Sequence, residues 1–212
     1  GAVAGVRDIK NPINAARAVM DHSEHVMLCG AGASEFAKQK GLEIVPNKYF
    51  FTESRYQSLQ QLLKQERERE KKDNMGTVGC VVLDTEGNLC AGTSTGGMTN
   101  KKFGRIGDAP IIGAGTYANN KTCAISCTGH GEYYIRLGFA RDISAMMEYK
   151  NLSVDEACKA EISKLDAMKG DGGVIAVDAE GNIALEFNTS GMFRGYIKAS
   201  GEKDIAIFKD NY

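Results

Sequence analysis

The stretch Gly76-Thr77-Val78-Gly79 is the first place in this sequence that could carry chemistry. It lies between a run of charged residues, 66–73, and an apolar run that predicts a buried strand. Its ordinary interpretation is a strand that begins after a loop. The alternative is a cleavage site, because cutting the Gly76–Thr77 bond would give Thr77 a free α-amine. With a pKa of about 8, that amine could act as the base for the threonine's own hydroxyl.

A second candidate site combines hydroxyl groups with an arginine and an aspartate. The hydroxyls are in Thr93-Ser94-Thr95, and the charges are in Gly104-Arg105-Ile106-Gly107-Asp108. Hydroxyls at a strand end commonly form turns, and an Arg and an Asp three residues apart commonly form a surface pair. An arginine between glycines could instead bind a carboxylate through two nitrogens, and Asp108 could bind an ammonium group.

A third candidate site runs from Ser126 to Glu132, where a predicted strand passes through glycines into a predicted helix. Gly129 and Gly131 begin the spacing of a dinucleotide-binding loop, but Tyr134 occupies the third glycine position. The parallel-strand context of such a loop is also missing, so we exclude a dinucleotide site. Backbone N–H groups at this bend could instead stabilise an oxyanion.

The elements around these sites predict an α+β fold. Apolar spacing predicts helices over residues 12–21, 34–40, about 56–63 and 134–149, and a further helix capped by Ser153 and Glu156. Strands are expected over 26–29 and 123–128. Two hairpins, 78–95 and 174–188, share the turn pattern Asp-x-Glu-Gly-Asn. Strands and helices in blocks favour a layered, mostly antiparallel sandwich over a barrel of βαβ units.

Composition excludes several classes of function. The 26 basic and 27 acidic residues nearly cancel, so we expect neither a nucleic-acid partner nor an anionic membrane surface. No apolar run approaches the ~20 residues of a membrane span, and residues 1–10 lack a signal core, which favours a cytoplasmic protein. The six cysteines form no C-x-x-C pair and are expected to be reduced core residues. His22 and His25 lack further ligands at zinc spacing, so a metal there is disfavoured.

Five motifs together resemble the plant-type asparaginase/isoaspartyl aminopeptidase family of N-terminal-nucleophile hydrolases. They begin at Gly76, Ala91, Gly104, Gly113 and Cys127, and read GTVGCVVLD, AGTSTGGMTN, GRIGDAP, GAGTYA and CTGHGE. Their order and spacing make the likeness specific. It extends to KNPI from Lys10 and GMFRG from Gly191, and so covers essentially the whole chain.

The resemblance implies an αββα four-layer sandwich and an inactive precursor that cuts itself before Thr77. Residues 1–212 would form one domain, made after cleavage of chains 1–76 and 77–212, with a linker at about 65–76. Two such cleaved molecules would associate as a dimer. The substrates implied are asparagine and β-aspartyl dipeptides, and no cofactor is required. A structural sodium ion is also implied, but its loop belongs to a family segment that this sequence does not include.

By position in the family's motifs, each candidate site acquires an expected role. Thr77 matches the nucleophile, and Thr95 the hydroxyl that supports its activation. The segment Arg105, Ile106, Gly107 and Asp108 matches the substrate clamp, with Arg105 on the α-carboxylate and Asp108 on the α-ammonium. Thr128 and Gly129 match the oxyanion site, and the loop of Gly129, His130 and Gly131 lies beside the substrate.

Two alternatives stay open at this point. Glycosylasparaginase, a sister family with a similar Gly-Arg-x-Gly-Asp stretch, has an aspartate immediately before its threonine, where Gly76 stands here. Its disulfide-bearing, secreted character also has no counterpart in these cysteines. A degenerate, non-catalytic relative is the other alternative, and the intact Thr77, Thr95, Arg105 and Asp108 argue against it.

Overall fold

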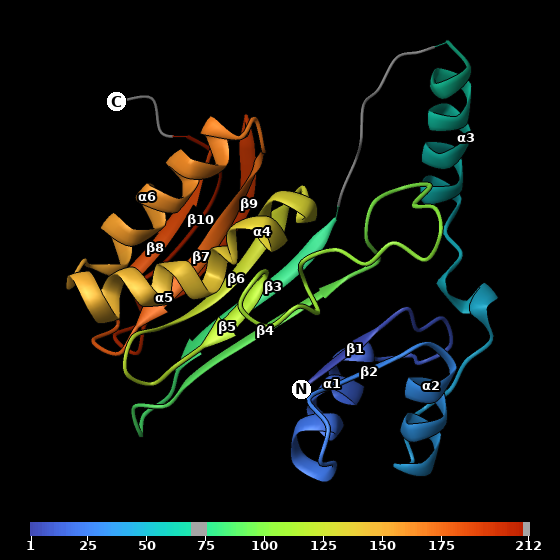
Figure 1. Cartoon of the computed structure of the whole chain (residues 1–212), viewed down its shortest axis with the longest axis horizontal. Coiled ribbons are helices and arrows are strands. Elements are labelled where there is room, and N and C mark those ends of the chain that lie inside the picture. The colour runs from blue at the N-terminus through green and yellow to red at the C-terminus, as the bar shows by residue number, and fades with distance from the viewer. Residues whose placement is uncertain (69–75, 210–212) are drawn as a thin grey trace. The chain divides into compact units, whose positions relative to one another are not determined.

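A computed structural model of the chain describes residues 1–68 and 76–209. Its contacts form two compact units (Figure 1). The first unit comprises Gly1–Val78 and Ser94–Pro110, and the second comprises Gly79–Thr93 and Ile111–Tyr212. Most of the expected charged linker, residues 69–75, lies outside the described residues.

The first unit is built on a short parallel strand pair joined by a helix. Its elements are β1 (Ala2–Ala4), α1 (Pro12–His22), β2 (Met27–Cys29), α2 (Gly30–Gln39), the 3-10 helix η1 (Asn47–Phe50) and α3 (Glu53–Glu68). The strands β1 and β2 pair in parallel, and α1 supplies the crossover that a parallel pair requires. Ile9, Ala15 and Ala37 form a small core in this unit.

The predicted elements of the first unit are largely confirmed, with three corrections. Asn11-Pro12 predicts a helix start capped by the asparagine side chain. Pro12 is the first residue of α1, but the Asn11 side chain makes no capping hydrogen bond. The strand predicted at 26–29 is expected to be buried. It forms as Met27–Cys29, but Met27 and Cys29 are exposed. The helix predicted from Ser34 begins at Gly30, directly after β2.

The second unit contains an antiparallel sheet, two hairpins and three helices. Its elements are β3 (Thr77–Leu83), β4 (Leu89–Thr95), β5 (Thr116–Ala118), β6 (Cys123–Gly129), α4 (Gly131–Leu137), α5 (Phe139–Lys150), α6 (Val154–Ala167), β7 (Gly172–Asp178), β8 (Ile183–Phe187), β9 (Gly191–Ile197) and β10 (Lys203–Phe208). The first two residues of β3 and the last two of β4 are grouped with the first unit. The strands β5–β6–β7–β8 form a four-stranded antiparallel sheet. The pairs β3–β4 and β9–β10 are separate two-stranded sheets.

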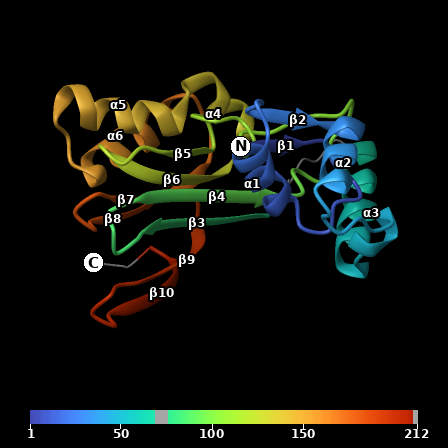
Figure 2. The ribbon, with the colours of Figure 1, turned by 90° about the horizontal axis from the view of Figure 1, so that it is seen from below.

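Alternate residues of the central strands face different layers of the second unit. On β6, Ile125 and Cys127 belong to the core shared with α5 and α6. Ala124, on the opposite face, packs with Leu89 of the β3–β4 hairpin. Because successive side chains of a strand point to opposite faces, one sheet can be covered on both sides. Figure 2 shows α5 and α6 along one face and the hairpin along the other.

The repeated Asp-x-Glu-Gly-Asn pattern forms the same turn in both hairpins, as predicted. Between β3 and β4, the Asp84 carboxylate accepts the backbone N–H of Asn88 at 2.7 Å and its side-chain amide at 3.0 Å. Between β7 and β8, Asp178 accepts the same two groups of Asn182, both at 2.8 Å. The aspartate thus satisfies backbone donors that the turn would otherwise leave unpaired.

The prediction of one continuous helix over 134–149 is wrong, because two helices, α4 and α5, occupy this stretch. They meet at Gly138, whose φ of 61° is the left-handed conformation that ends a helix. The apolar face expected on this helix comprises Ile135, Phe139, Ile143 and Met146. The last three are buried, whereas Ile135 is 39% exposed. The capping box predicted for the next helix is present, since the Ser153 hydroxyl accepts the Glu156 N–H.

The expectation that the cysteines are core residues is only half correct. All six are free thiols, and Cys123, Cys127 and Cys158 are buried. Cys29, Cys80 and Cys90 are exposed, because they lie at the end of β2 and on hairpin faces that the described part of the chain does not cover. In the stretches described, none of the helices combines the length and the apolar character that crossing a membrane would require.

Candidate active site

Thr77 is the first residue of β3, and Thr95 is the last residue of β4, so both lie at the open end of the β3–β4 hairpin. The Thr95 hydroxyl donates a hydrogen bond to the carbonyl oxygen of Gly76 over 2.9 Å. The backbone N–H of Gly97 donates to the same hydroxyl oxygen, also over 2.9 Å. This second bond occupies an acceptor position of the hydroxyl. It thereby helps to orient the hydroxyl so that its proton points toward the Gly76 carbonyl oxygen.

The end of the Arg55 side chain, which belongs to α3, lies beside Gly76 in the first unit. A Cβ atom at Gly76 would come within 2.8 Å of the Arg55 Nη2 atom. Nη2 is the far end of a flexible side chain, which could move to admit a side chain at Gly76. The close approach brings a cationic side chain beside the Gly76–Thr77 peptide bond.

Lys101 is a functional candidate that the sequence interpretation missed. Its ammonium donates to the Gly96 carbonyl over 2.7 Å, directly after Thr95. Burial lowers the pKa of Lys101, and the positive charges of Arg105 and Arg7 lower it further. A cation four residues before Arg105 was the available signal, although lysines in loops are too common for it to stand out.

The segment from Arg105 to Asp108 forms a compact loop in the same unit. The Arg105 guanidinium lies over Gly107, where a Cβ atom would be 2.7 Å from Nη1. Asp108 is buried, with 8% of its surface exposed, whereas Ile106 is 40% exposed. The loop therefore combines a positive group and a buried negative group. Those are the two charges needed to bind an amino acid's carboxylate and ammonium.

In the second unit, Thr128 and Gly129 end β6 beside the start of β7. Gly129 pairs with Gly172, and the backbones approach so closely that neither position has room for a side chain. A Cβ at Gly129 would lie 2.4 Å from the Asp171 carbonyl oxygen, and its φ of 152° favours glycine as well. The buried Tyr134 donates its hydroxyl to the Thr128 carbonyl over 3.0 Å. The peptide between Thr128 and Gly129 is thus tightly held.

His130 follows Gly129 as the residue before α4, and it contacts Asp171 twice. Its backbone N–H donates to the Asp171 carbonyl over 3.2 Å. Its ring Nδ1 lies 2.9 Å from the Asp171 carboxylate. The ring also meets Tyr133 edge-on and is about one-third exposed. Asp171 was not a candidate from the sequence, because it lies 41 residues away along the chain.

The hydroxyl groups of Thr116, Thr93 and Ser126 form a chain of contacts, in which Ser126 is buried and the two threonines are half-buried. Thr93, two residues before Thr95, lies 2.7 Å from the hydroxyl of Ser126, which is two residues before Thr128. Thr116 donates to Thr93 over 2.5 Å. Gly79 completes the contact, since a Cβ there would overlap Ser126 Oγ at 2.2 Å. These residues belong to the second unit and anchor the strands that carry the threonines.

The structure therefore groups the predicted site residues in two sets. Gly76, Thr77, Thr95 and the Arg105–Asp108 loop belong to the first unit. Thr128, Gly129, His130 and Gly131 belong to the second. Within residues 1–68 and 76–209, no three His, Cys, Asp or Glu side chains form a group that could hold a metal ion.

Comparison with known proteins shows what this chain resembles. The family model described as asparaginase matches residues 1–207. The isoaspartyl peptidase of Escherichia coli K12 is 49% identical, over 99% of this chain and 68% of that protein. The isoaspartyl peptidase of Salmonella typhimurium is 47% identical, over 99% of this chain and 70% of that protein. The isoaspartyl peptidase/L-asparaginase of Bos taurus is 40% identical, over 91% of this chain and 63% of that protein.

Proposed function

Because this chain belongs to the asparaginase family, we propose that it is a hydrolase of β-aspartyl dipeptides and L-asparagine, with Thr77 as its nucleophile. The identity of 40–49% to isoaspartyl peptidases over most of the chain supports this activity. The helix, sheet and hairpin layers of the second unit support an αββα four-layer sandwich. The substrates are small molecules with an amide on the aspartyl side chain.

The hydrogen bond from Thr95 to the Gly76 carbonyl is the observation that carries the proposal. In the uncut chain, the Thr77 hydroxyl attacks the carbonyl carbon of Gly76. The C–N bond breaks as a C–O ester bond forms, and the Thr77 nitrogen takes up a proton. Negative charge develops on the Gly76 oxygen during this step, and the Thr95 hydroxyl already donates to that oxygen. Water then hydrolyses the ester and leaves Thr77 with a free amine and a free hydroxyl.

The matured Thr77 performs the same chemistry on substrate. Its amine accepts the proton of its hydroxyl, whose oxygen attacks the side-chain carbonyl of asparagine or of a β-aspartyl peptide. Ammonia or the peptide's amine leaves with a proton, and a β-aspartyl ester remains on Thr77. Water hydrolyses this ester and releases aspartate. Such acyl transfer needs a nucleophile, a base and a site for the oxyanion, but no organic cofactor.

The remaining candidate residues bind the substrate and the developing charge. Arg105 binds the α-carboxylate, and the buried Asp108 binds the α-ammonium. Thr128 and Gly129 stabilise the oxyanion, and the loop of Gly129, His130 and Gly131 borders the leaving group. We propose further that two cleaved molecules associate as a dimer in the cytoplasm.

The proposal is tested by replacing Thr77. Thr77→Ala should leave one uncut chain with no hydrolysis of β-aspartyl dipeptides, because both hydroxyl attacks are lost. Thr77→Ser should cut more slowly and retain activity, because a hydroxyl remains. Thr85→Ala, in the exposed turn of the same hairpin, is the matched control and should cut and hydrolyse as the wild type does.

Denaturing gels and N-terminal sequencing give the readout. The wild type should yield a fragment that begins at Thr77, together with dipeptide hydrolysis. An uncut wild-type chain that still hydrolyses β-aspartyl dipeptides would refute the threonine mechanism.

A further inference from the structure

The segment from Gly170 to Gly173 carries a single side chain, that of Asp171. Each of its glycines is packed too tightly for a Cβ atom. Such an atom would lie 2.5 Å from Leu165 Cδ1 at Gly170, 2.2 Å from the Thr128 carbonyl oxygen at Gly172 and 2.5 Å from Met192 Sδ at Gly173. The Asp171 side chain, in contrast, is 58% exposed. It fills no space in the core, so packing does not account for it.

The backbone on both sides of Asp171 is held by one residue, Asn188. The Asn188 Oδ1 atom accepts the N–H of Gly172 over 2.9 Å, and its Nδ2 donates to the Gly170 carbonyl over 2.9 Å. The backbone N–H of Asn188 donates to the Gly172 carbonyl over 3.1 Å. Asp171 is therefore presented from a fixed position at the start of β7.

From this position Asp171 reaches His130 through both its backbone and its side chain. A carboxylate only accepts hydrogen bonds, so the 2.9 Å contact requires a proton on His130 Nδ1. The contact therefore sets the ring's tautomer and its rotation about the side-chain bonds. With the backbone bond of 3.2 Å, two points fix the residue that directly follows Gly129.

We propose that Asp171 is a positioning residue for the Thr128–Gly129 peptide and acts through His130. Gly129 has no side chain, so its orientation depends on its backbone pairing with Gly172 and on its two neighbours in the chain. Thr128 is fixed by strand pairing and by Tyr134, and His130 is fixed by Asp171. Donors to an oxyanion act well only when they are held in place before the reaction. This inference rests on the proposed function, which assigns the oxyanion to Thr128 and Gly129.

Kinetics of Asp171 variants test the inference. Asp171→Ala should lower kcat for a β-aspartyl dipeptide about threefold to tenfold, with KM changed less than about twofold, because one exposed polar contact is lost. Asp171→Asn keeps an acceptor and should recover most of that loss. Asp155→Ala is the matched control, since it removes one exposed 2.7 Å contact, to Lys159, and should leave kcat unchanged.

A double-mutant cycle separates positioning from a general structural effect. If Asp171 acts through His130, Asp171→Ala should have no further effect on kcat in a His130→Ala background. Full wild-type kcat in Asp171→Ala would overturn the inference, and so would an equal loss of kcat in the wild-type and His130→Ala backgrounds. Either result would leave the proposed function standing. A wild type that does not hydrolyse the dipeptide would overturn the proposed function, and the inference with it.

A readout that does not depend on activity completes the design. The sequence contains three histidines, so the ring nitrogens of His130 can be assigned by NMR. In the wild type, His130 should show a protonated Nδ1, and Asp171→Ala should shift its signal while His22 and His25 keep theirs. An unchanged His130 signal in Asp171→Ala would contradict the contact itself.

Discussion

At the scale of single residues, the hydroxyl of Thr95 would have different partners before and after maturation. In the uncut chain it donates to the Gly76 carbonyl. The proposed cleavage would turn that carbonyl into a terminal carboxylate, which would be free to move away from Thr77. The Gly97 N–H would still hold the Thr95 oxygen, so the hydroxyl would stay in place. We infer that one preorganised donor serves the cut first and the nucleophile afterwards.

The substrate clamp gives a prediction at the same scale. Arg105→Ala should raise KM for β-aspartyl dipeptides roughly 10- to 100-fold, because a charge-assisted contact of about 1.5–3 kcal/mol is lost. Self-cleavage should persist, since the Gly76–Thr77 bond needs no substrate carboxylate. Lys102→Ala removes an exposed positive charge from the same loop and should leave KM unchanged. Unchanged KM in the Arg105 variant would exclude Arg105 from the clamp.

Residues with a local motif of their own could be proposed as site residues from the sequence, and residues that depend on distant partners could not. Thr77, Thr95 and Arg105 lie in short stretches whose types and spacing already indicate chemistry. Asp171 matters because the chain returns beside His130 after α4, α5 and α6. Lys101 is notable only because other charges and burial act on it. No local pattern contains those neighbours.

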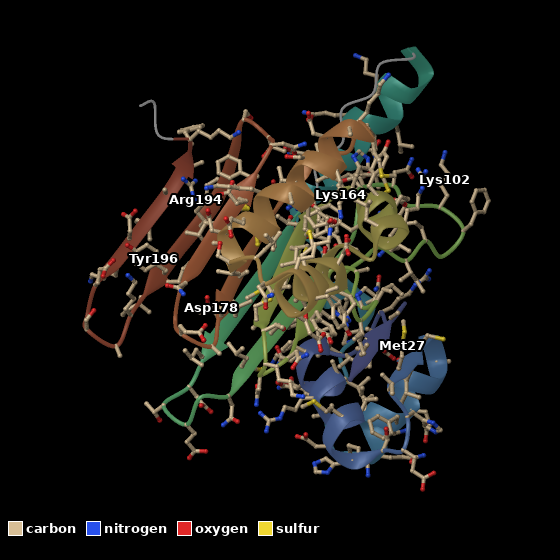
Figure 3. All side chains as sticks on the ribbon, turned by 60° about the vertical axis from the view of Figure 1, so that its left-hand side comes forward. Met27, Lys102, Lys164, Asp178, Arg194 and Tyr196 are labelled. Carbon is tan, nitrogen blue, oxygen red and sulfur yellow. The ribbon has the colours of Figure 1, made fainter. Side chains whose placement is uncertain are left out.

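At the scale of elements, a buried carboxyl group lies where α6 packs against α5. Glu161 of α6 is fully buried and forms an ion pair with Lys164 on the same helix. Lys164, labelled in Figure 3, also pairs with Asp142 of α5. Burial raises the pKa of Glu161 to about 7, and its hydrogen bond with Asp142 contributes to the increase.

This pair of helices should make stability depend on pH. Between about pH 4.5 and 7 the folded protein binds a proton at Glu161 that the unfolded chain has released, so the free energy of unfolding falls as pH rises. The pKa of Asp142 is lowered, so its titration changes the free energy of unfolding only at lower pH. The pKa of Lys164 is raised, so its titration does so only at higher pH. Glu161→Gln should match the wild type near pH 5 and exceed it by up to about 3 kcal/mol at pH 8. Denaturant unfolding across this range measures the difference, and a constant difference would contradict the assignment.

The elements show where sequence patterns stop being sufficient. The two turns and the capping box were predictable because each depends on residues within a few positions of one another. The break at Gly138 was not, because a glycine within an amphipathic stretch can either continue a helix or end it. Contacts of the chain after the break decide the outcome here, since the Ala140 and Arg141 N–H groups donate to the carbonyls of Ala114 and Gly113.

At the scale of the whole molecule, the compact units do not follow the order of the chain. The first unit takes residues from both sides of the Gly76–Thr77 bond, namely Gly1–Val78 and Ser94–Pro110. Sequence patterns describe neighbours along the chain, so they predict helices and strands but not this grouping. The proposed cut therefore falls inside a unit, and contacts within that unit join the two fragments.

The fragments should accordingly remain together after cleavage. Under native conditions, fragments 1–76 and 77–212 should elute from a sizing column as one species, because both supply the first unit. In denaturant they should elute separately, and the uncut Thr77→Ala variant should elute as one chain in both conditions. Native elution of fragment 77–212 without its companion would show that the contacts of the first unit do not hold the fragments.

A unit divided between two chains also changes the molecularity of folding. The uncut chain folds in a first-order process, with a tether that keeps the two segments at a high effective concentration. Once the Gly76–Thr77 bond is gone, the same contacts must form between separate molecules, and the rate then depends on how dilute they are. The cut protein would therefore refold more slowly than the uncut chain after denaturation, and the intact precursor would be the form that folds most readily.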